Sequence, residues 1–482
     1  MASLRWSIRF VALVVFLAAC TSSSQPAEPT APPDAFAPTP TIGDMAPPTT
    51  TRPAPTTTLD VDRTTVYPVD PVTLEALPGF EPIPMGDWAW GVSSPNGRWL
   101  ALVRGEDTGG RGESLSGLAL IDIPAWELAG EWAQLESSPM TVTDDGVIYA
   151  VTYSASSPQL VRATIGSDQP DVLAEFSPGF SPWDLPRLWD GEIVLAGHSY
   201  DTGSVQGMLS VVTVDPTNGT KLETPIPAGL VGPIKLIELE SGRLGVVDSY
   251  PALTWDENNG RLLVVPSTED LIVEFDTATG GITQHRFGGD TDESLPVEIS
   301  QAQVNSAEIW ASARRTAALS PHGRVMYVSG AAGEISEEEG APVSVTTPSG
   351  ILAIDTETWG VIDRLDAPIS DLFLSPDGTR LIAGGYREEF TDSRQESESS
   401  GIFVLDPIGL EVLAHHPPGP AEGFMGQVSF SRDGSLAYVT TYGEGETASV
   451  IDLETGAILA ERDDILVFGE VATVADTGNG KG

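Results

Sequence analysis

The sequence predicts an all-β protein, a β-propeller of eight four-stranded blades, with seven blades as the alternative. Two repeated signals carry this prediction. One is a phrase of apolar residues, an aspartate, a short turn and a second apolar stretch, which recurs seven times at a spacing of roughly 45–60 residues. The other is a glycine turn, usually Asp-Gly or Asn-Gly, between two extended runs. The aspartate phrases span 66–77, 118–132, 209–223, 271–285, 351–365, 402–416 and 448–462.

Each signal predicts a β-hairpin. The aspartate side chain can bond to the backbone of its own turn, and the flanking runs favour β-branched and large aliphatic residues. In the glycine turns, glycine supplies the positive φ that a tight hairpin requires. A glycine hairpin followed by an aspartate hairpin makes one four-stranded unit. The glycine turns lie within 94–103, 143–151, 188–196, 256–265, 320–328, 375–384 and 431–439.

The two ends of the repeat region are incomplete, which predicts how the ring closes. Seven units fit between residues 88 and 462 if the hairpin at 159–176, which lacks its aspartate, is counted. The hairpin at 66–77 and the apolar runs at 465–475 are left over. We expect the N-terminal outer strands to pair with the C-terminal inner strands, because closure removes unpaired sheet edges. The stretch 235–250 is a candidate extra hairpin.

The repeats resemble those of the YVTN-type bacterial β-propellers, distant relations of the WD-repeat propellers. The likeness rests on SPDGTRLIAGG with FVLDPIGLEVL, and on SRDGSLAYVTT with SVIDLETGAIL. It spans 66–475 and implies radial sheets around a channel. It does not imply one activity, because relatives include lactone hydrolases, quinoprotein dehydrogenase subunits and binding scaffolds.

Residues 1–19 are predicted to be a lipoprotein signal peptide. Arg5 and Arg9 precede an apolar run too short to span a bilayer, and Leu17-Ala18-Ala19-Cys20 resembles the bacterial lipobox. Cys20 is the only cysteine and has no disulfide partner, so a lipid attachment site explains it better than a redox role does. The alternative is a chance cysteine after a cleavable signal. We expect the chain to be anchored through Cys20 to the outer face of the cell membrane.

Three further segments follow from composition. Residues 20–60 carry the lipidated cysteine and a stalk rich in Ser, Thr and Pro, a composition that stays extended. Residues 61–476 form the propeller, and 477–482 are predicted to be a disordered tail.

The chain is strongly acidic, with 69 Asp and Glu against 24 Lys and Arg and a formal net charge of −45. Such a charge repels nucleic acid, so we exclude nucleic acid as a partner and expect a monomer. Two interpretations of the acidity stay open. One is a solvated surface, as in salt adaptation, and the other is attraction of a cation or a basic partner.

Long acidic links between strands predict where binding occurs. They span 104–117, 330–350 and 386–400, with a further insertion at 288–310, and loops on a rigid scaffold commonly carry function. We expect these links to form a rim at one face of the ring. Its candidate binding residues are Trp88, Trp183, Trp310, Glu337, Glu338, Glu339, Glu388 and Glu389. The alternatives are a solvated loop for the glutamates and packing between blades for the tryptophans.

Signs of catalysis are few. The five histidines show no metal-ligand spacing, and GHSYD (197–201) lacks the second glycine of a nucleophile elbow. No cofactor is evident, although Asp290 and Asp292 approach a Ca²⁺-binding pattern. The sequence therefore favours a membrane-anchored binding or scaffolding module whose long-loop face engages a protein, glycan or cation. A cation-dependent hydrolase such as a lactonase and an accessory subunit of an exported redox enzyme are the alternatives.

Overall fold

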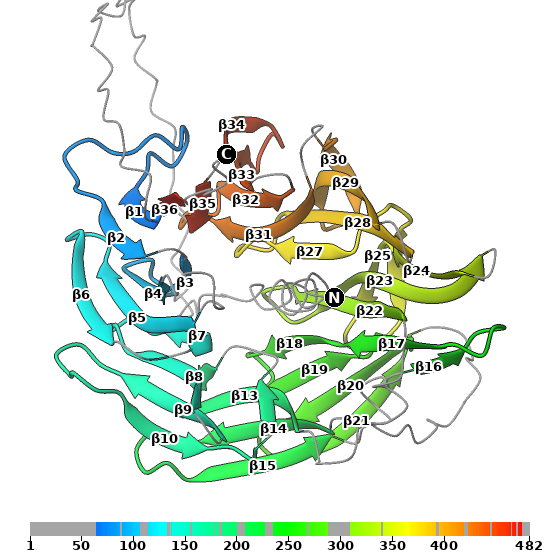
Figure 1. The fold of residues 1–482 in the computed structure, drawn as a ribbon, viewed down its shortest axis with the longest axis horizontal. Coiled ribbons are helices and arrows are strands. Elements are labelled where there is room, and N and C mark those ends of the chain that lie inside the picture. The colour runs from blue at the N-terminus through cyan, green and yellow to red at the C-terminus, as the bar shows by residue number, and fades with distance from the viewer. Residues whose placement is uncertain are drawn as a thin grey trace, which may run out of the picture.

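The protein is a ring of β-sheets, described here from a computed structural model (Figure 1). All elements in the described part of the chain are β-strands, β1 to β36. The predictions for Cys20, the signal peptide, the stalk and the tail concern residues outside that part. The described residues are 64–86, 89–106, 114–132, 135, 137–154, 157–178, 180–182, 186–199, 208–226, 235–267, 269–287, 309–338, 341–391, 395–418, 423–443, 446–463, 465–468 and 471–474.

Five stretches of the chain form regular blades, in which strands consecutive in sequence pair antiparallel in chain order. The third blade has its innermost strand split in two, since β11 and β12 both pair with β13. The blades are β3 (Ala89–Ser93), β4 (Trp99–Glu106), β5 (Ser114–Asp122), β6 (Glu127–Trp132); β7 (Ser137–Val142), β8 (Ile148–Ser154), β9 (Ser157–Ala163), β10 (Asp171–Glu175); β11 (Phe180–Pro182), β12 (Arg187–Trp189), β13 (Glu192–Ser199), β14 (Met208–Val214), β15 (Lys221–Ile226); β18 (Ala252–Asp256), β19 (Arg261–Val265), β20 (Leu271–Asp276), β21 (Ile282–Arg286); and β31 (Phe424–Phe430), β32 (Leu436–Tyr442), β33 (Glu446–Asp452), β34 (Ile458–Asp463).

A single sheet of 11 strands lies between the fourth and fifth of these blades. It contains two hairpin units that are joined because β24 pairs with both β23 and β28. Its strands are β16 (Lys235–Glu238), β17 (Leu244–Tyr250), β22 (Ile309–Leu319), β23 (Val325–Glu338), β24 (Ala341–Pro348), β25 (Ile351–Asp355), β26 (Val361–Leu365), β27 (Asp371–Leu374), β28 (Leu381–Thr391), β29 (Gln395–Asp406) and β30 (Glu411–His416). The candidate extra hairpin at 235–250 is present, as β16 and β17.

The two ends of the chain meet in one sheet. β1 (Thr64–Pro68) pairs with β36 (Val471–Val474), which also pairs with β35 (Ile465–Phe468), while β2 (Ile83–Gly86) adds to β1. The predicted pairing of N-terminal with C-terminal strands is thus observed. The predicted hairpin at 66–77 is not, because its second arm is reduced to one bridge between Val69 and Ala76.

The predicted eight blades, and the alternative of seven, are wrong, because the structure has five regular blades. The links at 330–350 and 386–400 cause part of the difference, since they continue as strands and fuse two units. The strands at the chain ends do not make a separate blade either. They join the first blade through the pairing of Gly86 with Gly105, which gives one eight-stranded sheet.

The short turns have the predicted chemistry. The glycines of the glycine turns adopt positive φ, as at Gly378 (72°) and Gly434 (71°). The aspartates of the aspartate phrases accept hydrogen bonds from their own turns, and Asp355 Oδ1 accepts from the backbone N–H groups of Glu357 (3.0 Å) and Thr358 (2.7 Å). These aspartates are therefore turn caps. We call the end of the ring where the short turns gather the turn end.

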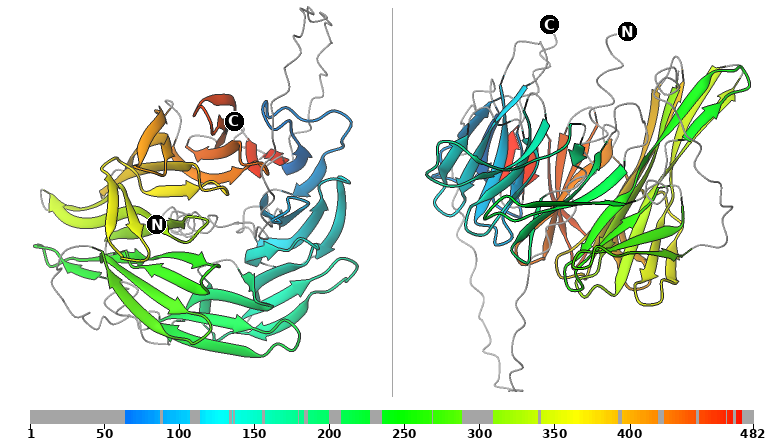
Figure 2. Two further views of the ribbon diagram at one scale, coloured as in Figure 1. Left: turned by 180° about the vertical axis from the view of Figure 1, so that it is seen from behind. Right: turned by 90° about the horizontal axis from the view of Figure 1, so that it is seen from below.

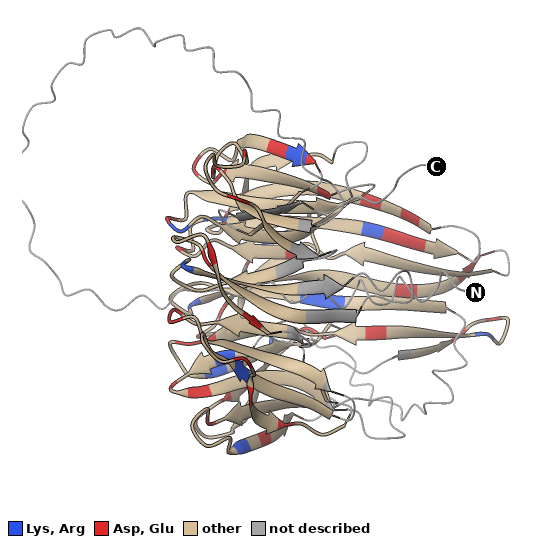
Figure 3. Cartoon of the chain, turned by 60° about the vertical axis from the view of Figure 1, so that its left-hand side comes forward, with Lys and Arg blue, Asp and Glu red and all other residues tan. Residues whose placement is uncertain are grey.

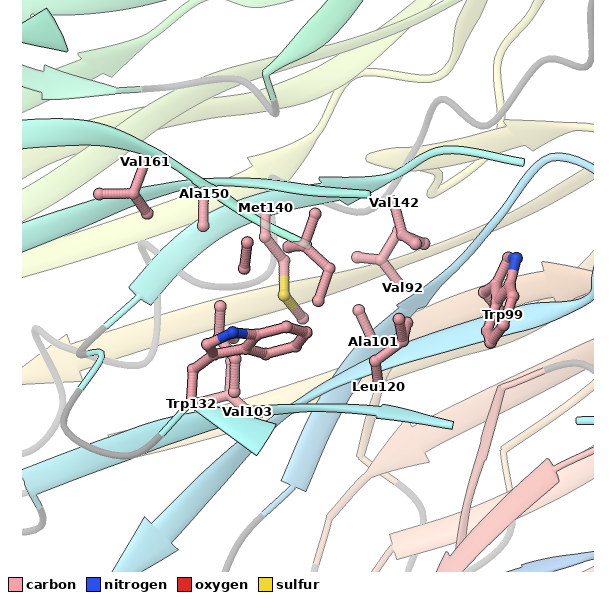
Figure 4. Packing of buried hydrophobic residues seen from close by; sticks show 13 residues of the cluster. Val92, Trp99, Ala101, Val103, Leu120, Trp132, Met140, Val142, Ala150 and Val161 are labelled. Atoms are coloured by element: carbon pink, nitrogen blue, oxygen red, sulfur yellow. The ribbon is translucent and has the colours of Figure 1, made fainter. Parts of the chain in front are cut away.

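The core is divided among the interfaces between neighbouring sheets. Figure 4 shows one cluster, in which Trp132 from β6 packs beside Met140 from β7 and Ala150 from β8. Trp132 is 1% exposed, and its Nε1 donates to the Ser167 carbonyl at 2.8 Å. Burying such a side chain stabilises the fold by roughly 1.5–3 kcal/mol. Each interface thereby fixes the position of the next sheet in the ring.

Candidate functional site

Long strands of the 11-stranded sheet extend beyond the ring at the end opposite the turn end (Figure 2, right). β23 has 14 residues and β29 has 12, whereas the longest strand of a regular blade, β5, has 9. Five further residues lengthen a strand by about 17 Å. We call the extension the wing. It consists of β16, β17, β24 and residues 309–313, 332–338, 386–391 and 395–400 of the neighbouring strands.

The wing is a small sandwich with its own apolar core. Ile335 of β23 lies in one buried cluster with Val247 of β17, Leu239, and Ile309 and Ala311 of β22. Gly245 of β17 faces Ile335, since a Cβ added there would lie 2.9 Å from the end of the Ile335 side chain. β23 therefore packs against β17 and β22 through apolar side chains. The wing is thus ordered β-structure, where the sequence predicted irregular loops.

A buried ion pair joins the wing to the ring. Arg314 Nη2 donates to Asp371 Oδ2 at 2.7 Å and to Ser370 Oγ at 3.0 Å, and the Arg314 side chain is 4% exposed. The guanidinium carbon also lies 5.0 Å from the ring centroid of Tyr386. Burial, the largest single influence, lowers the pKa of Arg314, but the charge and hydrogen bond of Asp371 together with Tyr386 and the charge of Glu388 outweigh it, and the pKa is raised. The pair fixes β22 against β27 and β28.

Two further carboxyl groups at the root of the wing are shielded from solvent, which raises their pKa values. Burial raises the pKa of Asp248 on β17 to about 6. Burial also raises the pKa of Glu388 on β28, although the amide of Gln395, which donates to Glu388 Oε1 at 3.1 Å, and the charge of Arg314 oppose the shift. Both groups are therefore costly to ionise where they stand.

An aromatic row continues from the root to the fifth regular blade. The ring of Phe424 lies 5.1 Å from that of Tyr386 and 5.8 Å from that of Tyr442. Tyr442 needs Gly426 beneath it, because a Cβ there would lie 1.9 Å from the tyrosine ring. The row links three strands of two units, β28, β31 and β32, and holds the wing rigidly on the ring.

Strand register assigns the wing glutamates to two faces. Glu334, Val345, Glu389 and Glu396 are successive partners across β23, β24, β28 and β29, so they point to the same side of the sheet. Glu338 and Glu398 share that side, because alternate residues of a strand do. We call this side the acidic face. Arg387, whose Nη2 donates to Glu389 at 2.7 Å, is the one basic residue within the described strand segments of this face.

Some of the predicted rim residues lie on the acidic face, and others do not. Glu338 and Glu389 lie on the acidic face, whereas Glu337 and Glu388 point to the other side. Glu337 accepts a hydrogen bond from the backbone N–H of Ser241 at 3.0 Å, which closes the wing against the β16–β17 turn. Trp310 lies on β22 and is 40% exposed. Three rim residues fall outside the described residues: Trp88, Trp183 and Glu339.

Figure 3 shows acidic positions along the projecting strands. The wing sheet contains seven glutamates and one arginine, counted over the described segments 332–338, 341–348, 386–391 and 395–400.

Sequence reasoning missed Glu334, Glu396 and Glu398 as members of one face, and missed Arg314, Asp371 and Tyr386 at the root. The available signal was Arg314-Arg315 inside an otherwise apolar strand, an unusual place for charge.

The turn end has a different character. His285 stacks on Trp359 with ring centroids 3.9 Å apart, and its Nε2 lies 2.8 Å from Glu274 Oε2. A cavity of about 460 Å³ opens nearby and is lined by Asn258, His322 and Arg324. These contacts join neighbouring sheets at their turns.

The described residues bear on metal binding and on membrane spanning. In the ranges that the structure describes, no group of three His, Cys, Asp or Glu side chains is placed to hold a metal ion. The candidate Ca²⁺ residues Asp290 and Asp292 lie outside those ranges. The same part of the chain contains no helix long and apolar enough to cross a bilayer.

Comparison with known proteins finds only distant structural likenesses. No family model and no curated protein matches the sequence. Among solved structures, Sqt1 from Chaetomium thermophilum is 15% identical with a TM-score of 0.48, covering 86% of this chain and 97% of that one. The Dos1 propeller is 14% identical (TM-score 0.46; 86% and 96% covered), and BamB from Moraxella catarrhalis is 10% identical (0.42; 80% and 95%). At these TM-scores, we take neither fold nor ligand from the likenesses.

Proposed function

We propose that the protein is a binding module: a lipid-anchored extracytoplasmic propeller that holds a cationic partner on the acidic face of its wing. The observation that carries the proposal is the register of β23, β24, β28 and β29, which puts Glu334, Glu338, Glu389, Glu396 and Glu398 on one side of a sheet. A regular sheet holds these charges at fixed spacing.

The electrostatics favour a basic partner. Several carboxylates on one surface make the local electrostatic potential more negative and so attract a cationic ligand. Salt screens this attraction with a Debye length of about 8–10 Å. Glu334, Glu338 and Glu398 are exposed, so a partner can reach them without rearranging the sheet. The braced root supports the same function, because a rigid surface loses little entropy on binding.

The anchor belongs to the proposal. Cys20 would carry the lipid, and the stalk to residue 60 would hold the ring away from the membrane. Cys20→Ala should move the protein from the membrane to the soluble fraction, and unchanged fractionation would refute the anchor without bearing on the wing.

Binding is tested with a short lysine-rich peptide and two variants of equal charge. The wing variant is E334Q/E338Q/E389Q/E396Q/E398Q. The control variant, E127Q/E192Q/E357Q/E411Q/E454Q, removes five exposed glutamates in or next to short turns at the turn end. Calorimetry at low salt should show binding by the wild type and the control and its loss in the wing variant, and high salt should weaken the binding that remains.

Equal loss in both variants would mean that net charge alone attracts the peptide, and the proposal would fail. Lactone hydrolysis by the purified chain at ordinary enzyme rates would instead support the alternative of a propeller hydrolase.

A further inference from the structure

The first half of β29 is a sheet edge. β30 pairs only with Ile402–Asp406, so it covers the second half of β29. Residues 395–399 pair with β28 on one side, and no other strand in the described part of the chain lies along them. A strand edge offers backbone N–H and C=O groups to any extended chain that can lie beside it.

This edge differs from the other outer edges of the ring in its register and in the sign of its charges. Five outer strands carry a register shift against their neighbour: β6, β10, β26, β30 and β34. The two that run without a shift, β15 and β21, contain Lys221 and Arg286. Bulges and charged side chains, Lys above all, are common means of preventing edge-to-edge pairing.

The β29 edge has no bulge and no basic side chain, and its charged residues, Glu396 and Glu398, are acidic. From Tyr386 with Ser399 to Phe390 with Gln395, its register against β28 is unbroken, and residues 395–400 contain no basic residue. A bulge does occur, but earlier, between Gly384 and Tyr386, where the ring ends and the wing begins. The straight part of the edge is therefore confined to the projecting segment.

The charges along this edge select the occupant. Glu396 and Glu398 are two residues apart and share a side of the strand, with Glu389 on the adjacent strand. A second copy of this edge would bring glutamates opposite glutamates, which disfavours pairing between copies. A strand with Lys or Arg at every second position would instead place a cation opposite each carboxylate.

We propose that the β29 edge binds an extended basic segment of a partner protein as an added β-strand. The segment pairs through its main chain and carries Lys or Arg at alternating positions facing Glu396 and Glu398. This mode of recognition draws affinity from the backbone ladder and specificity from alternate side chains. The inference rests on the proposed function, which it deepens by naming the partner's conformation.

Three synthetic peptides of equal charge test it on the full-length chain. The first alternates Lys and Thr. The second has the same sequence with N-methyl groups on alternate residues, which removes ladder donors and keeps every charge. The third has the same composition with its lysines in one block. We expect the first peptide to bind about tenfold or more tightly than the others, because they lose the ladder or the charge spacing.

Matched protein variants locate the site. E396Q/E398Q should weaken binding of the alternating peptide by about 2- to 30-fold, as expected for two cross-strand charge pairs. E454Q/E461Q, in and beside the bulged outer strand β34, should leave it unchanged.

The outcomes separate the two proposals. If all three peptides bind equally and the five-residue wing variant abolishes binding, strand addition is overturned and the acidic face stands. If none binds, both fall. A dimer of the free chain that Ser397→Pro dissociates would show a second copy at the edge and would overturn the basic partner.

Discussion

Asp433 at the turn end and Asp248 at the wing root have pKa values that are shifted in opposite directions. At the turn end, hydrogen bonds from the Ser431 and Ser435 hydroxyls and from the Ser435 backbone lower the pKa of Asp433 to about 2. At the wing root, burial raises the pKa of Asp248 to about 6. Asp433 thus fastens its hairpin, whereas Asp248, unlike the ion-paired Asp371, costs stability when it is ionised. A residue that lowers the stability of the fold is typical of a functional region.

The largest expected effect comes from breaking the buried ion pair at the root. Asp371→Ala leaves the Arg314 guanidinium, 4% exposed, without its carboxylate. Removing one partner of a buried pair costs about 3–5 kcal/mol in the free energy of unfolding. Urea denaturation measures the loss.

The matched control replaces both partners by apolar residues of similar size, as in R314M/D371L. Such replacements are often neutral or stabilising. If the double variant were as unstable as Asp371→Ala, the loss would come from Ser370 or from packing and not from an uncompensated charge.

The second largest expected effect is the pH dependence of stability that comes from Asp248 at the wing root. The pKa of Asp248 is about 6 in the folded chain and about 3.9 when unfolded, so its favourable contribution is complete below pH 4 and is lost as pH rises through 6. Asp248→Asn should therefore raise stability by about 1–3 kcal/mol above pH 7 and change little near pH 4. Denaturation at the two pH values checks this, and an equal change at both would refute burial as the cause.

The smallest effect has the opposite sign. Because the folded pKa of Asp433 is depressed to about 2, its stabilisation is present above the unfolded value and is lost as pH falls through 2. Asp433→Asn should lower stability at neutral pH by less than about 1 kcal/mol, since the group is exposed and screened. Near pH 2 the variant and the wild type should converge, and a persistent gap would indicate a packing defect.

The sequence predicted the hairpins because their determinants are local. The aspartate caps and the positive-φ glycines act within a few residues, so Asp355 and Gly378 could be read directly. It overcounted the blades because pairing between units is not local. Nothing near residues 341–348 or 386–391 specifies that β24 will pair with β28 and fuse two units.

The acidic face was foreseen only in part for the same reason. Glutamate-rich and serine-rich segments have low strand propensity, and tertiary pairing overrides it here. Once the segments are strands, alternation sends Glu337 and Glu388 to one side and Glu338 and Glu389 to the other. A run of glutamates in sequence therefore does not show which of them share a surface.

Hydrogen exchange along β29 tests the central claim, that the wing is the binding region, most directly. Amide exchange is followed in the full-length chain with and without the alternating lysine peptide. The account predicts added protection at residues 395–400 and none at the turn end, for example at Ser431–Leu436. Protection at the turns, or peptide binding that leaves the β29 amides unchanged, would contradict it.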